Sequence, residues 1–345
     1  MSRSRLLPDA VLLAVAVVWG GSYLAAKDLA EATSAAAVMC LRFLPAALIL
    51  LAIAAGRRRF RALRAVTGPG LLLGTLRAAT IALETIGVTL TSATNAGLII
   101  GLSVLFTPIL ESAAARRRLS GQLMAAVLLG IAGVALLVGG EGLSTPNTGD
   151  LLILAAAVTR ALLGVAGARL TAGGADVLPL TTIELTFGAI VFTLWGGGPA
   201  RGSLAHLTGH DWAVLAYLSI GCTLVAFLGQ LWATKHTSAS RAGILLGTEP
   251  AWALGIGILL AGDTIGPTGL AGALILLAAV TWGGRAEHHW RTNATLATPA
   301  RPGSGRTHHN GPDSTHSEPA SPAGSPRPQP PSNDSPSARR RSVAQ

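Results

Sequence analysis

Three ionisable side chains, Arg77, Arg160 and Glu249, lie deep inside long apolar stretches of the sequence. A charge in hydrocarbon costs at least about 2.5 to 3.5 kcal/mol on insertion scales, so such residues are candidates for function. At about 1.5 Å per residue from the predicted helix starts, all three lie about 15 Å deep, near the middle of a bilayer. We therefore expect these three residues to form a binding site for a small solute.

The charges of this predicted site indicate which solutes it would accept. Arg77 and Arg160 with Glu249 leave a net positive charge, which favours an anionic or zwitterionic solute such as an amino acid. A cationic compound would instead prefer a carboxylate with aromatic rings, and Trp19, Tyr23 and Trp252 could supply those rings. Aromatic side chains also pack membrane helices, so this interpretation of the rings stays open as well.

Glu249 is a candidate for binding a proton. It precedes Pro250, whose ring disrupts the backbone hydrogen bond of the previous helical turn. Freed carbonyls beside a carboxylate at mid-depth make a reasonable cation or proton site. The alternative is that Glu249 forms a structural ion pair with Arg77 or Arg160.

Three other charges lie closer to the predicted helix ends. Arg42 and Glu184 occupy matched positions in the second and seventh predicted helices and carry opposite charges, so we expect a structural charge pair between them. Glu84 follows Arg77 by seven residues, two turns along one helix face. That stripe is expected to face the interior rather than lipid.

The elements that carry these charges are predicted to be membrane helices. Half of the residues are hydrophobic and only 12% are charged, whereas about 25% are charged in an ordinary soluble domain. Runs of about 20 residues with none or one ionisable group recur, the length needed to cross about 30 Å of hydrocarbon. The predicted fold class is an all-α integral membrane protein with ten helices, at residues 10–27, 34–55, 68–88, 93–115, 120–139, 150–169, 177–196, 211–232, 238–260 and 266–283.

Basic residues are concentrated on one side of these helices. With a cytoplasmic N-terminus, the inside segments contain clusters such as 57–64 and 116–118, whereas the outside segments contain only Lys27 and Arg201. This bias predicts a multi-pass protein of the cell membrane with both termini cytoplasmic. It also explains the net charge of +10 without a nucleic-acid partner.

One motif occurs twice, as TSATNAGLIIG at 91–101 and as TSASRAGILLG at 237–247. Five predicted helices separate the copies, an odd number, so the second copy enters the membrane from the opposite side, as in an inverted repeat. The same shift of 146 residues aligns Arg77 with Thr223. The predicted organisation is a cytoplasmic N-terminus, a five-helix repeat, an external loop, a second five-helix repeat and a disordered cytoplasmic tail, at 1–9, 10–139, 140–149, 150–283 and 284–345.

Each copy of the motif combines a helix start with two glycines. Thr91 and Ser92, like their counterparts in the second copy, can accept the free N–H groups of the first helical turn. The G-x-x-x-G spacing lets another helix approach closely where no hydrophobic effect drives association. We expect helix-packing surfaces at Gly97, Gly101, Gly243 and Gly247. These surfaces either move or pack statically.

The combination of these features resembles the EamA-type branch of the drug/metabolite transporter superfamily. The residues that carry the resemblance are Trp19-Gly20-Gly21-Ser22, Arg42-Phe43, the Thr-Ser-Ala turns and Glu249-Pro250, within about 10–283. The resemblance implies two bundles of five helices around a central cavity, and a secondary transporter, mostly an exporter of small metabolites, that works by alternating access. Under this interpretation Glu249 would couple transport to protons. Arg160 departs from the family, in which a tryptophan is common at that position.

Other functional classes are disfavoured by the motifs the sequence lacks. It contains no G-x-x-x-x-G-K-[ST] loop for a nucleotide and no H-E-x-x-H or G-x-S-x-G constellation for an enzyme. Cys40 and Cys222 have no metal-ligand spacing, so neither a metal nor a cofactor is expected. Efflux of drugs or cationic compounds by the same fold, and a non-transporting scaffold or sensor, stay open. Both repeats lie in one chain, so a monomer suffices, although a dimer is possible.

Overall fold

The computed structural model describes residues 3–114, 116, 120–138, 147–236 and 245–297. These residues are helical throughout, with short turns and loops between the helices, as the sequence predicts. The helices of the first repeat are α1 Arg3–Ala32, α2 Ala35–Gly56, α3 Phe60–Ala65, α4 Thr67–Leu90, α5 Ala93–Ile100, α6 Ser103–Ala114 and α7 Gly121–Val138. Those of the second are α8 Thr148–Ala172, α9 Val177–Ser203, α10 Gly209–Ala216, η1 Tyr217–Val225, α11 Ala226–His236, α13 Glu249–Leu260 and α14 Pro267–Ala297.

Within the described residues, nine helical segments are long and apolar enough to cross a membrane. The tenth predicted helix, at 238–260, is represented by α13, which has only 12 residues. Residues 237–244 of that prediction, with Gly243, lie outside the described residues.

The predicted helix at 93–115 is interrupted at Gly101 and Leu102, where α5 ends and α6 has not begun. Leu102 N bonds to Ile99 O at 3.0 Å, an i to i−3 contact of the tighter 3₁₀ type. The second repeat makes the same bond 146 residues later, from Thr248 N to Leu245 O at 3.2 Å, directly before α13. The repeat therefore includes a break in the fourth and ninth helices, which the sequence analysis treated as continuous.

The eighth helix is irregular as well. Between α10 and α11, the segment η1 is a π-helix, with backbone hydrogen bonds between residues five apart, and side chains bind two of its carbonyls. Trp19 Nε1 donates to Cys222 O at 3.0 Å, and Thr223 Oγ1 donates to Leu218 O at 2.8 Å. Two carbonyls of η1 thus accept a hydrogen bond from a side chain, one from α1 and one from η1 itself.

The last helix is longer than expected. Residues 284–345 were predicted to form a disordered tail, but α14 continues to Ala297. Residues 285–297 contain neither proline nor glycine, so nothing in their composition stops the helix once it has started. The remainder of the predicted tail, 298–345, lies outside the described residues.

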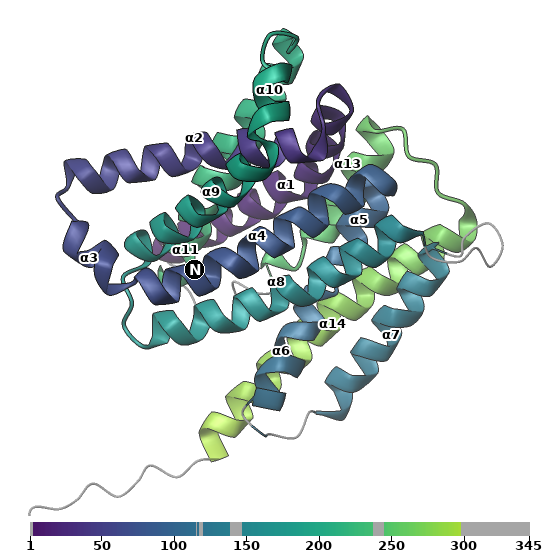
Figure 1. Cartoon of the computed structure of the whole chain (residues 1–345). Helices are drawn as coiled ribbons and strands as arrows, with labels where there is room; N and C mark the ends of the chain where they lie inside the picture. Colours follow the sequence, from purple (N-terminus) through teal and green to yellow (C-terminus); the bar gives the residue numbers. More distant parts are fainter. Residues whose placement is uncertain (1–2, 115, 117–119, 139–146, 237–244, 298–345) are drawn as a thin grey trace, which may run out of the picture. The chain divides into compact units, whose positions relative to one another are not determined.

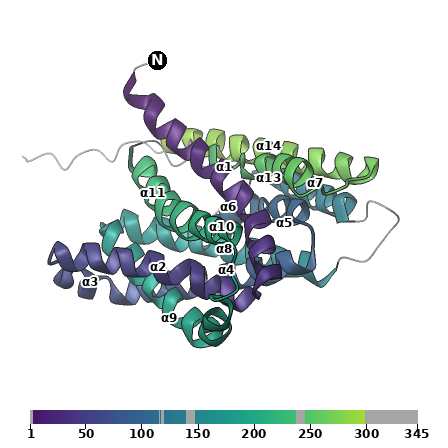
Figure 2. The ribbon, with the colours of Figure 1, turned by 90° about the horizontal axis from the view of Figure 1, so that it is seen from above.

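The two repeats pack through matched pairs of helices, one from each repeat. α2 packs on α9, and α7 on α14 (Figures 1 and 2). Further contacts between the repeats include those of α4 with α8 and α9, of α1 with α11 and α13, and of α5 with α13. Backbone approaches backbone at these contacts: a Cβ added to Gly133 would lie 2.9 Å from Gly272 O, and one added to Gly196 would collide with Ala36 O.

One set of helix ends is joined by polar contacts between the repeats. Thr91 Oγ1 donates to Asp150 Oδ1 at 2.6 Å, and Thr94 N donates to Asp263 Oδ2 at 2.9 Å. Ser92 caps α5 by accepting from Asn95 N at 3.0 Å, as predicted, whereas Thr91 binds Asp150 instead of capping. By chain topology these residues lie on the face opposite the N-terminus.

Candidate functional site

The structure brings together two of the three predicted deep charges, Arg160 of α8 and Glu249 of α13. The guanidinium binds the carboxylate through two bonds, Nη2 to Oε2 at 2.6 Å and Nη1 to Oε1 at 3.0 Å. Tyr23 of α1 donates its hydroxyl to Glu249 Oε1 at 2.5 Å and accepts from Arg160 Nη1 at 3.2 Å. Glu249 is 5% exposed and Tyr23 4%. This bidentate, charge-assisted contact between buried groups is the centre of the candidate site.

The helix break places Glu249 at this depth. Glu249 is the first residue of α13, and 12 residues of helix span about 18 Å, so its carboxylate lies about that far from the opposite end. The helix N-terminus carries a partial positive charge that favours a carboxylate. Pro250 belongs to the first turn, where its missing N–H has no helical partner to lose. The prediction that Pro250 bends a continuous helix and frees carbonyls of the preceding turn is therefore wrong; the helix starts here.

Glu84 of α4 is a second acidic neighbour of Arg160. Its carboxylate lies 3.8 Å from the Arg160 guanidinium, and the two side chains are 14% and 23% exposed. Glu84 was predicted to lie on an interior stripe of its helix but not in the binding site. Its spacing of seven residues from Arg77 was the signal that could have included it.

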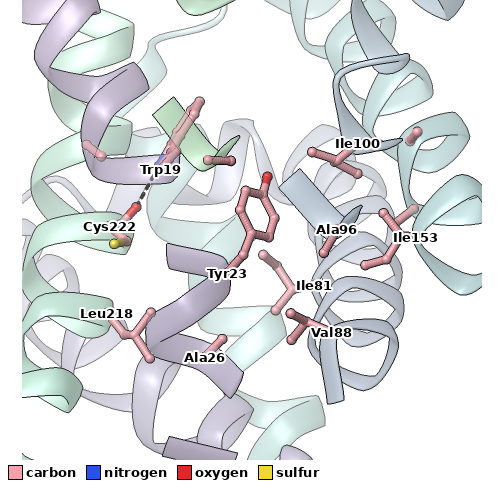
Figure 3. Close-up of a cluster of buried hydrophobic side chains, with 14 of the residues drawn as sticks. Trp19, Tyr23, Ala26, Ile81, Val88, Ala96, Ile100, Ile153, Leu218 and Cys222 are labelled. Carbon is pink, nitrogen blue, oxygen red and sulfur yellow. Dashed lines mark hydrogen bonds between the residues drawn. The ribbon is translucent and has the colours of Figure 1, made fainter. Parts of the chain in front are cut away.

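Aromatic rings separate this centre from a second arginine. The Arg160 guanidinium carbon lies 5.2 Å from the ring centroid of Trp19, and that of Arg77 lies 4.0 Å from the ring centroid of Phe227. The two rings are 5.5 Å apart. Trp19 is held in place by its bond to Cys222 O, and Tyr23 extends from the next turn of α1 (Figure 3). Phe227 was missed from the sequence, since nothing distinguishes it there from other apolar residues.

Arg77 and Arg42 do not have the partners expected of them. Arg77 Nε binds Glu184 Oε1 at 2.6 Å, and Arg42 Nε donates to Thr223 Oγ1 at 2.8 Å. The predicted pair of Arg42 with Glu184 is therefore wrong. These two residues are repeat mates at different depths, and each binds the nearest polar group on a neighbouring helix, α4 for Glu184 and η1 for Arg42.

The inverted repeat explains both contacts. The shift of 146 residues maps Arg77 onto Thr223. The earlier helices of the two repeats align with a different shift, of 142 residues, which maps Arg42 onto Glu184. The Arg77–Glu184 ion pair and the Thr223–Arg42 hydrogen bond are thus two copies of one contact. Trp19 and Arg160 also occupy nearly matched positions, and they contact each other, so the site lies where the two repeats meet.

The central charges cancel, which corrects the prediction of a net positive site. The predicted charge included only Arg77, Arg160 and Glu249. The structure places two further carboxylates, those of Glu184 and Glu84, within 4 Å of Arg77 and Arg160, respectively. The full group contains three arginines and three glutamates: Arg42, Arg77, Arg160, Glu84, Glu184 and Glu249.

Trp252 lies apart from the other predicted aromatic residues. Its side chain is 39% exposed, compared with 7% for Trp19, and its Cβ lies beside Gly20 of α1. It follows Glu249 by three residues, but the structure does not bury it with the charged group.

Two of the four predicted packing glycines lie on a helix-helix contact. A Cβ added to Gly97 would collide with Ala253, and one added to Gly101 would collide with Pro250, so α5 packs directly on α13. Gly247 is buried in the turn before α13 rather than on a helix face. The packing prediction therefore describes the first copy and not Gly247.

The sequence profile of the EamA-like transporter family matches residues 6–139 and 147–282, one EamA domain for each repeat. The chain belongs to the EamA-like transporter family. A solved structure titled "Crystal structure of protein" has a TM-score of 0.54 and 17% sequence identity, covering 82% of this chain and 98% of its own. That likeness concerns the fold. No curated protein matches the sequence.

Membership in the EamA family makes the chain a multi-pass membrane transporter rather than an enzyme. Within its described residues, no group of three or more His, Cys, Asp or Glu side chains could hold a metal ion. Cys40 and Cys222 are buried and form no disulfide.

Proposed function

We propose that this EamA transporter exports a small zwitterionic or anionic metabolite, such as an amino acid, by alternating access coupled to protons. The observation that carries the proposal is the bidentate contact of Arg160 with Glu249, buried where the repeats meet. A zwitterion matches this pair charge for charge. Its carboxylate can replace Glu249 on the guanidinium, and its ammonium can then bind Glu249 and Glu84.

Proton coupling follows from competition for the carboxylate of Glu249. A protonated Glu249 offers no charge to an ammonium group, so solute and proton bind in alternation rather than together. Alternation of this kind exchanges a proton entering the cell for a solute leaving it. Both termini are proposed to be cytoplasmic, in agreement with the basic clusters at 57–64 and 116–118.

The aromatic rings favour a metabolite over a cationic drug. Trp19 and Phe227 already lie against the guanidinium groups of Arg160 and Arg77, at 5.2 and 4.0 Å. Their π-faces are therefore occupied by cations of the protein itself. Trp252, the ring that is free of such contact, is exposed outside the charged group.

The test is transport in proteoliposomes that contain the purified full-length protein. Counterflow of labelled amino acids, screened in mixtures, identifies the solute class, and an acidic medium outside should accelerate solute efflux. The variant Glu249→Gln should lose this response to the pH gradient, whereas Asp176→Asn, at an exposed ion pair with Arg59, should keep it. Full pH dependence in Glu249→Gln would show that the coupling role is wrong, and counterflow of organic cations but no zwitterion would reassign the substrate.

A further inference from the structure

Among the described residues, no carboxylate lies within 4 Å of Arg42, whereas each other member of the central charged group has an oppositely charged side chain within that distance. Among the described residues, the recorded ion pairs involve Arg59, Arg77, Arg160 and His210 but not Arg42. Arg42 is nevertheless 5% exposed. It is the eighth residue of α2, so it lies about 10 Å along the helix, within the hydrocarbon region. An unpaired charge at such a position is costly, and membrane proteins retain one where it has a task.

The inverted repeat shows what Arg42 would need. In the matched contact, Arg77 has the carboxylate of Glu184 at 2.6 Å. Arg42 has instead the hydroxyl of Thr223, which occupies the repeat position of Arg77. The same geometry thus holds an ion pair in one half of the protein. In the other half it holds a guanidinium bonded to a hydroxyl, with no carboxylate within 4 Å among the described residues.

The guanidinium of Arg42 also has N–H donors without a recorded acceptor among the described residues. A guanidinium has five N–H donors and no acceptor. Only the Nε of Arg42 has a recorded acceptor among the described residues, Thr223 Oγ1 at 2.8 Å. The Thr223 hydrogen is already donated to Leu218 O. One turn earlier on η1, the hydroxyl of Ser219 is buried and makes no hydrogen bond in the described part of the chain.

We propose that Arg42 and Thr223 form a second binding site, separate from Arg160 and Glu249, for a small monovalent anion. The Nη groups of Arg42 are the donors to the anion, because a guanidinium can be satisfied only by a group with lone pairs. Thr223 fixes the plane of the guanidinium through Nε. A single negative charge supplies what Glu184 supplies to Arg77. The anion is either the carboxylate of the transported solute or an inorganic ion such as chloride.

Binding is measured with purified full-length protein in detergent, using sodium chloride and sodium acetate as probes. The thermal unfolding midpoint should rise saturably with either anion, at an ionic strength held constant with sodium sulfate, because the anion binds the folded state. The variant Arg42→Gln should lose this rise. Thr223→Glu should lose it as well, since it gives Arg42 the carboxylate partner seen in the Arg77–Glu184 contact.

Thr223→Glu also guards against misfolding, because it keeps Arg42 and adds a neutralising partner. Arg59→Gln, at an exposed ion pair, is the control and should keep the rise. The absence of a saturable rise in the wild type, or an equal rise in Arg42→Gln and Thr223→Glu, would overturn the proposal.

The source of the anion is distinguished by transport, and this step rests on the proposed function, whereas binding does not. In counterflow, chloride should compete with the labelled solute if Arg42 receives the solute's carboxylate, and should accelerate exchange if it is a separate bound ion. Counterflow that responds neither to chloride nor to Arg42→Gln would contradict a role of this site in transport. Saturable anion binding without transport of any solute would instead contradict only the proposed function.

Discussion

The group formed by Arg160, Glu249 and Glu84 predicts an unequal response to removal of its positive and negative members. Arg160 binds Glu249 at 2.6 and 3.0 Å and lies 3.8 Å from Glu84. In Glu249→Gln, the arginine keeps Glu84 as a partner. In Arg160→Gln, two buried carboxylates remain with no cation between them. We therefore expect Arg160→Gln to be the more destabilising substitution.

The size of the difference follows from the distances. Removing one partner of a buried ion pair costs about 3 to 5 kcal/mol, and two charges about 4 Å apart interact by about 4 kcal/mol at an effective dielectric constant of 20. The destabilisation by Glu249→Gln should be about 3 kcal/mol or less, because Glu84 compensates part of the lost interaction with Arg160. The destabilisation by Arg160→Gln should reach about 5 kcal/mol. A difference of about 2 kcal/mol corresponds to about 4 °C in the unfolding midpoint.

The assay is thermal unfolding of the purified variants in detergent. Adding Glu84→Gln should raise the midpoint of Arg160→Gln more than that of the wild type, because it removes one of the two repelling carboxylates. Asp176→Asn, which breaks a surface ion pair whose side chains are 41% and 51% exposed, is the control and should change stability by less than about 1 kcal/mol. The reasoning is refuted if Arg160→Gln is no less stable than Glu249→Gln, or if Glu84→Gln has the same effect in both backgrounds.

Two further predictions concern α5 and α13. Gly97→Ala should lower the unfolding midpoint, because the new Cβ collides with Ala253. Gly255→Ala places its Cβ in open space, so it should be neutral or stabilise the protein by up to about 1 kcal/mol through helix propensity. Equal effects of the two substitutions would contradict this packing. Trp252→Leu should change the half-saturating concentration of the solute in counterflow less than twofold, because Trp252 is 39% exposed. Trp19→Leu should weaken solute binding strongly. A comparable loss of binding in both variants would place Trp252 in the site.

Much of the fold could be predicted because hydrocarbon imposes a length. The apolar runs located the spans, since about 20 residues are needed to cross a bilayer. The helix ends were predicted less well, because α1, α9 and α14 extend beyond the apolar runs. The breaks at Gly101 and before Glu249 could not be found this way, because a shift from α to 3₁₀ hydrogen bonding leaves no mark on hydropathy. The π-helix η1 is bound by Trp19, which is more than 200 residues away in the sequence, and no local pattern predicts that contact.

The members of the site were easier to predict than their partners. Depth alone selected Arg77, Arg160 and Glu249, because a charge far from a helix end is expensive. Which carboxylate meets which arginine depends on the rotation of each helix about its axis, and this is why Glu184 binds Arg77 and not Arg42. Counting charges on selected residues also produced the wrong net charge for the site.

The differences between the two repeats explain why the site needs both. Parts of the backbone are duplicated, including the 3₁₀ contacts of Leu102 and Thr248, although the π-helical segment η1 has no counterpart in α4. The charges are not duplicated, and each of four matched pairs has an ionisable residue in only one copy: Arg77 with Thr223, Glu84 with Gln230, Glu249 with Ser103, and Arg160 with Trp19. Arg42 with Glu184 is charged in both copies, with opposite sign. If both repeats had the same charged residues, like charges would lie at matched depths. Because the charged residues differ between the repeats, every central carboxylate lies within 4 Å of an arginine, and one arginine, Arg42, is left for an anion from solution.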